Sequence, residues 1–307
     1  MKKLSFFVLI FISLALMSCS DSNPVLTIEG GKVIGVQTLT KGIIAYKGIP
    51  FAAPPVGNLR WKEPQPVVPW EGVKVAGTYG AAAEQITWDP QSFYGREWRA
   101  SGSVPFNEDC LYLNVWTPAA GQTGKKLPVA MWIHGSGYRE GFAFEPEMDG
   151  GEVWASRGVI LVSVTYRLGV IGFFSHPLLS AESSHDVSGN YGLFDQIAAL
   201  KWIQNNIGQF GGDPNNITIF GQSAGAGSVQ SLCASPLSKN LISHAISMSG
   251  GGLSEMRPGI PLDTAQLANK TMMDYFKKTT LEDMRALSFE ELIKMSKVYT
   301  DTTKKRF

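Results

Sequence analysis

The stretch Gly221-Gln222-Ser223-Ala224-Gly225 follows directly on the apolar run Ile217-Thr218-Ile219-Phe220. The run predicts a strand, and the small residues after it predict a tight turn into a helix. In such a turn the serine takes a strained backbone conformation, and the flanking glycines let strand and helix pass close together. The turn would lift the Ser223 hydroxyl clear of the sheet, where a carbonyl carbon can reach it. The pattern therefore marks Ser223 as a candidate nucleophile.

Further segments on both sides of this turn share a family pattern. Residues 210–220 lead into the turn, and a second motif, Glu-Asp-Cys-Leu-Tyr-Leu-Asn-Val, occupies residues 108–115. The other matching segments are residues 48–57, 132–138, 166–169, 190–196 and 199–203. In this order and spacing, the chain after residue 24 resembles the type-B carboxylesterases, a family that includes carboxylesterases, cholinesterases and bacterial para-nitrobenzyl esterases.

The resemblance implies a fold and a chemistry. The fold is the α/β-hydrolase fold, a mostly parallel central sheet with helices on both faces, and the activity is hydrolysis of small-molecule carboxylic esters through an acyl-enzyme on Ser223. The oxyanion hole would be formed by the backbone N–H groups of Ser136, Gly137 and Ala224. Ser136 stands where the family usually has glycine, and its Cβ restricts the conformations of this loop. No metal or organic cofactor is implied.

Composition agrees with one globular enzyme domain over residues 25–307. The 307 residues are 44% hydrophobic and 17% charged, which suits a large core. A formal net charge of +1 and the lack of a rich basic tract give no case for nucleic acid as a partner.

The N-terminus reads as an export signal. Lys2 and Lys3 precede an apolar stretch from residue 4 to residue 17 that is short for a membrane span. It ends in Leu16-Met17-Ser18-Cys19, which resembles a bacterial lipoprotein cleavage box. We expect residues 1–18 to be a signal peptide and residues 19–24 a tether lipidated at Cys19, so that the protein is exported and held to a membrane. An ordinary signal peptide of a periplasmic or secreted protein, or a single membrane anchor, is the alternative.

Two cysteines remain apart from Cys19. The family often pairs the cysteine of the second motif, here Cys110, with one a short way upstream, but residues 79–85 contain none. We expect Cys110 and Cys233 to be free, buried thiols. A bridge between these two cysteines stays open.

Periodicity and turn signals give a coarse map of the elements. Residues 25–44 read as short antiparallel strands. Further strands are expected at 111–117, 127–133, 159–165, 217–220 and 244–249, and helices at 197–209, 224–233, 263–278 and 281–297.

The partners of the nucleophile are missing from this map. The resemblance implies an acidic residue and then a histidine after the serine, yet the single histidine after Ser223 is His244, which we interpret as structural. His176 and His185 fall in an upstream loop, as solvated or locally hydrogen-bonded side chains. The late acidic residues Glu282, Asp283, Glu290 and Glu291 fall on the last expected helix as surface charges.

We therefore expect the catalytic histidine and acid to lie beyond the chain end, with the strand near residue 245 left as an unpaired sheet edge. The alternatives to an esterase are a non-catalytic binding module with the same fold and an inactive truncated product.

Overall fold

The computed structural model describes residues 23–87, 89, 91–97, 104–145, 150–250 and 260–303. The predicted signal peptide and Cys19 lie outside these residues. Within them no helix is both long and apolar enough to cross a membrane.

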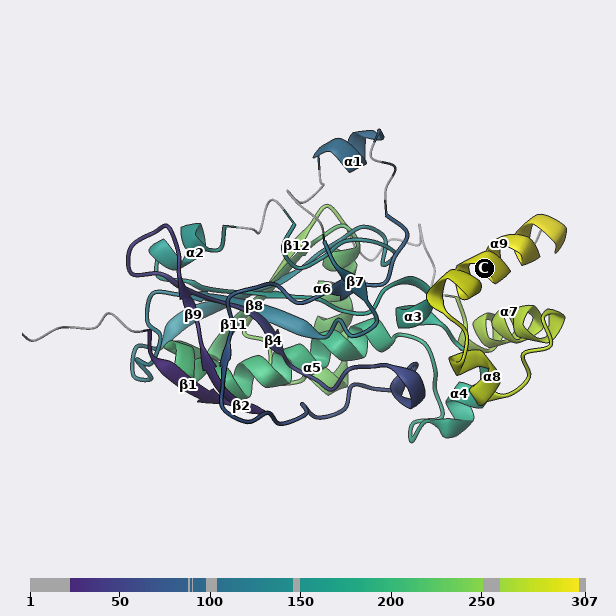
Figure 1. The fold of residues 1–307 in the computed structure, drawn as a ribbon, viewed down its shortest axis with the longest axis horizontal. Helices are drawn as coiled ribbons and strands as arrows, with labels where there is room; N and C mark the ends of the chain where they lie inside the picture. The colour runs from purple at the N-terminus through teal and green to yellow at the C-terminus, as the bar shows by residue number, and fades with distance from the viewer. Residues whose placement is uncertain are drawn as a thin grey trace, which may run out of the picture.

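A seven-stranded sheet forms the centre of the molecule (Figure 1). Its strands are β3 (Val36–Gln37), β4 (Ile44–Pro50), β8 (Tyr112–Thr117), β9 (Leu127–Ile133), β10 (Ile160–Val164), β11 (Gly212–Gln222) and β12 (His244–Met248). Their order is β12-β11-β9-β10-β8-β4-β3. Pairing is parallel from β12 to β10, the part that carries the serine turn, and antiparallel from β10 to β3, so the described sheet is mixed, with three parallel and three antiparallel pairings, rather than mostly parallel.

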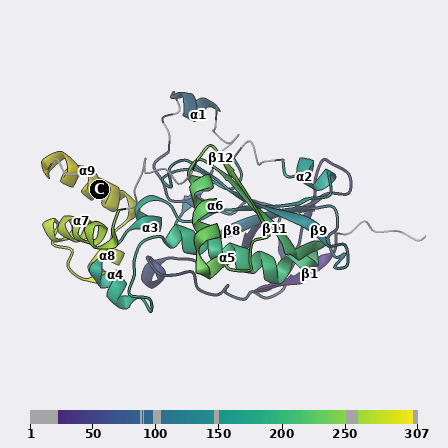
Figure 2. The same ribbon diagram turned by 180° about the vertical axis from the view of Figure 1, so that it is seen from behind.

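Helices cover both faces of this sheet, as the resemblance implies. Along β9, Val129 and Met131 pack into the core under α5 (Tyr191–Asn206) and α6 (Ala224–Ala234). Trp132 points to the other face, where it joins a core with the short helix α2 (Glu152–Ser156). Figures 1 and 2 show α2 on one side of the sheet and α5 on the other. Strand β10 is buried at every residue, because it is covered on both faces.

Smaller elements surround the sheet. The N-terminal strands β1 (Val25–Ile28) and β2 (Gly31–Ile34) pair antiparallel, as expected, and β5 (Val73–Val75) joins them in parallel. A short parallel pair, β6 (Ala82–Ala83) and β7 (Phe106–Asn107), lies apart from both sheets. The other short helices are η1 (Gly57–Leu59), α1 (Phe93–Glu97), α3 (Gly169–Phe173), α4 (Pro177–Glu182), η2 (Ile207–Phe210) and η3 (Pro236–Ser238).

Helix α5 begins six residues before the predicted start. Asn190 takes a left-handed conformation (φ 55°) and the helix starts at Tyr191. Its first turns contain the fully buried polar residues Asp195 and Gln196, so apolar periodicity does not mark them as helical. The helix is enclosed on most sides rather than amphipathic.

The C-terminal segment forms three helices instead of the predicted two, α7 (Leu262–Tyr275), α8 (Leu281–Arg285) and α9 (Phe289–Thr303). A capping box separates the last two: Ser288 Oγ accepts from the Glu291 N–H at 3.2 Å, and Glu291 Oε2 accepts from the Ser288 N–H at 2.7 Å. These helices are not purely surface elements, because an apolar face packs in a second core. Its members include Trp61, Phe174, Met272, Met273, Met284, Leu292 and Met295.

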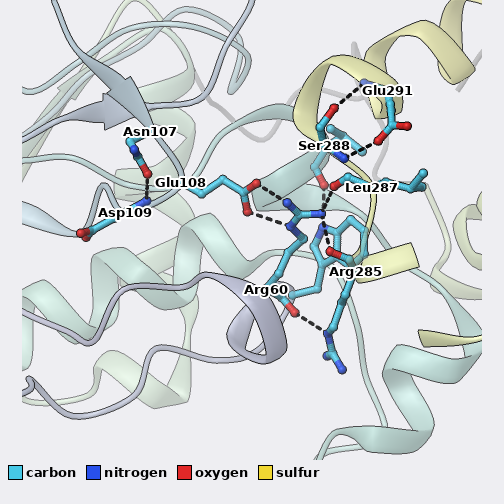
Figure 3. Close-up of polar contacts among 10 residues, drawn as sticks. Arg60, Asn107, Glu108, Asp109, Arg285, Leu287, Ser288 and Glu291 are labelled. Atoms are coloured by element: carbon cyan, nitrogen blue, oxygen red, sulfur yellow. Dashed lines mark hydrogen bonds and ion pairs between the residues drawn. The ribbon is translucent and has the colours of Figure 1, made fainter. Parts of the chain in front are cut away.

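Arg60 ties the C-terminal helices to the second sequence motif (Figure 3). Its guanidinium pairs with both carboxylate oxygens of Glu108, with Nε 2.7 Å from Oε2. Its Nη1 donates to the backbone carbonyls of Arg285 and Leu287, between α8 and α9. Arg285 returns a bond from Nε to the Arg60 carbonyl at 3.0 Å. Glu108 therefore links the second motif to the C-terminal helices through Arg60.

The two cysteines of the described residues are both free. Cys110 is buried as expected, and burial raises the pKa of its thiol. The expectation for Cys233 is wrong, since its side chain is exposed on α6. The face of α6 that covers the sheet carries Val229 and Leu232 instead.

Strand β12 ends the sheet, as expected. It pairs only with β11 among the described strands, and four of its five residues are exposed. Ile246 is 49% exposed, so this edge combines an open backbone with apolar side chains.

Candidate active site

The serine turn lies where β11 ends and α6 begins. Ser223 follows the last residue of β11 and has φ 55° and ψ −118°, a rare conformation for a residue with a side chain. Its N–H donates to the Met248 carbonyl at 2.9 Å, and its carbonyl accepts from the Gly227 N–H at 3.1 Å. Backbone bonds from β12 and from the first turn of α6 therefore hold the strained residue.

Two glycines make the turn possible. A Cβ on Gly225 would lie 2.1 Å from the Ile133 carbonyl oxygen of β9, and one on Gly221 would lie 2.6 Å from the Gly225 backbone. Real Cβ atoms do not approach backbone this closely. Helix α6 can therefore pass this close to the strand ends only because Gly221 and Gly225 have no side chain.

The loop after β9, residues 134–141, lies against this turn and is called here the oxyanion loop. A Cβ on Gly135 would be 3.2 Å from the Ser223 Cβ. Ser136, Gly137 and Tyr138 follow with φ values of 69°, 66° and 60°, three consecutive left-handed residues. Ser136 thus adopts the conformation that glycine favours, at some cost in backbone strain.

Three unengaged backbone donors accompany Ser223. The N–H groups of Ser136, Gly137 and Ala224 have no acceptor among the described residues. Ala224 is the first residue of α6, where N–H groups have no partner within the helix. Such donors beside a nucleophile suit a developing oxyanion, so the structure brings the predicted donors and Ser223 into one region.

His134 begins the oxyanion loop, but within the described residues its ring makes no hydrogen bond to Ser223. Its ring is buried, stacks on Tyr166 at 4.3 Å between centroids, and leaves Nε2 without a hydrogen-bond partner in the described structure. Burial lowers its pKa to about 3, so the imidazole is neutral. Tyr166 Oη donates to the His134 carbonyl at 2.7 Å. Sequence reasoning missed Tyr166 as a support of the site, although residues 166–169 were among the matching segments.

The remaining histidines lie elsewhere. His244, at the start of β12, pairs with Thr218 of β11. Thr218 lies five residues before Ser223, so at about 3.3 Å per residue His244 is about 16 Å from Ser223 along the strand direction. His176 caps α4, accepting from the Leu178 N–H at 3.2 Å, and burial lowers its pKa. His185 is exposed with Nδ1 3.8 Å from Glu63. The Ser223 hydroxyl has no hydrogen-bond partner within the described residues.

The late acidic residues lie on α8 and α9, with Glu282, Glu290 and Glu291 exposed and Asp283 partly exposed. A different carboxylate holds the segment that follows Tyr166. Asp195 of α5 is fully buried and accepts from Arg167 N, Nε and Nη2 at 2.7 to 3.0 Å. This pair joins two of the matching segments, 166–169 and 190–196, at the residue that follows Tyr166, the anchor of the oxyanion loop.

The fold and the serine turn define an α/β-hydrolase with a nucleophile-elbow serine. A model of the carboxylesterase family matches residues 22–307, and the chain belongs to this family. It is 44% identical over 232 residues to fumonisin B1 esterase of Sphingopyxis macrogoltabida, covering 75% of this chain and 40% of that protein. It is 43% identical over 236 residues to carboxylesterase 1F of Mus musculus, covering 75% of this chain and 41% of that protein.

A solved structure of a thermophilic PNB esterase superposes with a TM-score of 0.79 at 35% identity, covering 93% of this chain and 56% of that one. The prediction of the family and of the α/β-hydrolase fold is confirmed. The chain spans about half the length of the relatives it matches.

Proposed function

We propose that the protein is a carboxylic ester hydrolase that acts through an acyl-enzyme on Ser223. The observation that carries the proposal is the strained Ser223 beside three N–H groups that have no acceptor in the part of the chain that the structure describes. Ser223 Oγ would attack the acyl carbon, and the oxyanion would accept from Ser136, Gly137 and Ala224. The alcohol leaves, and water then releases the acid from the serine. The family and the esterase names of its relatives support this class of reaction.

The proton of the Ser223 hydroxyl needs a base. We propose that a histidine and an acidic residue from outside the given chain fill these roles, on a segment that extends the sheet beyond the open edge of β12. The 307-residue chain alone would then retain only about 10³–10⁴-fold catalysis over water and would be poorly soluble because of that edge. A non-catalytic binding module is the second candidate, favoured by the lack of a histidine at Ser223 among the described residues.

For the substrate we propose neutral esters. Gln222, the residue before the nucleophile, is uncharged where cholinesterases carry a glutamate, so a cationic alcohol group would find one attractive charge fewer at this position.

For the location we propose export followed by lipidation at Cys19, with an ordinary signal peptide as the alternative. Stable anchoring would need more than one acyl chain, since each buried CH₂ contributes about 0.8 kcal/mol. Mass spectrometry of the mature N-terminus tests this, and an unmodified terminus would exclude the lipid anchor.

The experiment that tests the activity compares Ser223→Ala with the parent in the longest natural form of the protein. Hydrolysis of a short para-nitrophenyl ester should fall by about 10⁶ in kcat with the fold intact. Activity near the parent level would mean that Ser223 is not the nucleophile. A parent that neither hydrolyses esters nor reacts with a fluorophosphonate would favour the binding module.

A further inference from the structure

The oxyanion loop returns to its own starting point. A Cβ on Gly141, which has φ 104°, would lie 2.5 Å from Nδ1 of His134, so the last residue of the loop presses against the first. Between them, Ser136 and Tyr138 hold left-handed conformations that are unfavourable for residues with a Cβ. A strained loop persists only where contacts from outside hold it.

Three such contacts reach the first part of the loop. Tyr166 Oη donates to the His134 carbonyl, and the Gly169 N–H donates to the Tyr138 carbonyl, both at 2.7 Å. On α6, Ser228 is fully buried and its Oγ lies 3.4 Å from Tyr138 Oη. None of these bonds reaches the last three residues of the loop.

Gln85 holds the end of the loop. Its Oε1 accepts from the Gly141 N–H at 2.8 Å, and its Nε2 donates to the Gly141 carbonyl at 2.9 Å and to the Ala83 carbonyl at 3.0 Å. Only one orientation of the amide satisfies all three bonds, since the flipped amide would set NH₂ against N–H and oxygen against two carbonyls. A carboxylate of the same length lacks the donor that both carbonyls need.

The segment that carries Gln85 is itself held in place by strand pairing and apolar packing. Ala83 belongs to β6, which pairs with β7, and the residues after the loop pack against the same pair. Phe142 and Phe144 form an apolar cluster with Ala82, against which Phe106 packs. Apolar packing therefore fixes the chain just after Gly141, and the Gln85 amide fixes Gly141 itself.

We propose that Gln85 is a positioning residue for the oxyanion hole. Through Gly141 it keeps the strained loop in the conformation that presents the Ser136 and Gly137 N–H groups to the acyl group on Ser223. Gln85 does not contact the substrate. The catalytic consequence rests on the proposed esterase function, whereas the hydrogen bonds between Gln85 and Gly141 are a property of the loop itself.

The first test measures amide hydrogen exchange in the full-length protein and needs no activity. Gln85→Glu removes the donor and sets a carboxylate against two carbonyls, and Gln85→Met removes all three bonds without a charge. Gln65→Glu is the matched control, because the exposed Gln65 amide bonds, among the described residues, only to the nearby Glu63 carbonyl. We expect exchange over residues 135–141 to rise about 10-fold in both Gln85 variants. Exchange over residues 224–234 of α6 should stay at the parent rate.

Parent-like exchange over residues 135–141 in a folded Gln85 variant would overturn the proposal. If Gln85→Glu does not fold, Gln85→Met decides the matter by the same measurement. A rise of equal size in α6 would also overturn it, since it would mean general loosening of the site.

The second test is kinetic, in the longest natural form of the protein. We expect Gln85→Glu to lower kcat for a para-nitrophenyl ester by about 10–100-fold with little change in KM, because misplaced oxyanion donors affect the transition state more than substrate binding. Adding Ser136→Gly should restore part of kcat by removing strain from the released loop. A raised KM with unchanged kcat, or no rescue, would contradict the positioning role. If the parent has no esterase activity, the proposed function fails, and the exchange result alone decides whether Gln85 holds the loop in place.

Discussion

The serine turn and the oxyanion loop meet at Gly135 and Ser223, yet they are held in different ways. The turn is held by backbone hydrogen bonds, one from the first turn of α6 and one to Met248 of β12, and by two glycines that let β9, β11 and α6 touch. The loop is held by side chains that are distant in sequence, Tyr166 and Gln85. The turn thus depends on backbone contacts and on its own glycines, whereas the loop depends on side chains from other segments, and the two should respond separately to mutation.

The largest expected effect comes from breaking the turn. Gly225→Ala places a Cβ 2.1 Å from the Ile133 carbonyl oxygen and 2.8 Å from that of His134. Both are backbone atoms that cannot move without opening the sheet, so we expect a loss of about 3 kcal/mol or more in the free energy of unfolding. Urea unfolding measures this. The control is Gly124→Ala, where a Cβ meets no atom within 4 Å and the stability should change by less than about 0.5 kcal/mol. Equal stability of the two variants would refute the close-packing argument.

The same contrast explains how much could be read from the sequence. The residues of β9 were predicted with both bounds correct, and the serine turn was placed correctly, because each is encoded by a local pattern. The break between α8 and α9 was missed, although Ser288 and Glu291 carry a capping-box pattern that could have shown it. Gln85 could not be found, since nothing near it in sequence indicates that its amide meets Gly141.

A second prediction uses pH to separate the two regions. Burial lowers the pKa of His134 to about 3, while in the unfolded chain it is close to 6.5. Between these values the unfolded state binds the additional proton, so the stability due to neutral His134 is full above pH 6.5 and is lost as pH falls toward 3. At pH 4.5 the loss should be about 2–3 kcal/mol.

His134→Phe keeps a flat ring against Tyr166 but does not titrate. We expect the free energy of unfolding to differ less between pH 7.5 and pH 4.5 in this variant than in the parent, by about 2–3 kcal/mol. An identical pH dependence in the two proteins would mean that His134 does not contribute to it.

The smallest effect concerns the strain in the loop. Ser136 has φ 69°, and replacing it with glycine removes a conformational penalty of about 1–2 kcal/mol in the folded state. Glycine also makes the unfolded chain more flexible, which offsets about 0.5–1 kcal/mol. We therefore expect Ser136→Gly to stabilise the protein by about 0.5–1 kcal/mol. The matched variant is Gly137→Ala, at φ 66° with no atom within 4 Å of the new Cβ, which adds backbone strain alone and should destabilise by a similar amount. Thermal unfolding of the two variants should shift in opposite directions. Shifts of the same sign would show that the loop conformation is not set by these backbone preferences, and that the tertiary contacts from Tyr166, Gly169 and Gln85 dominate it.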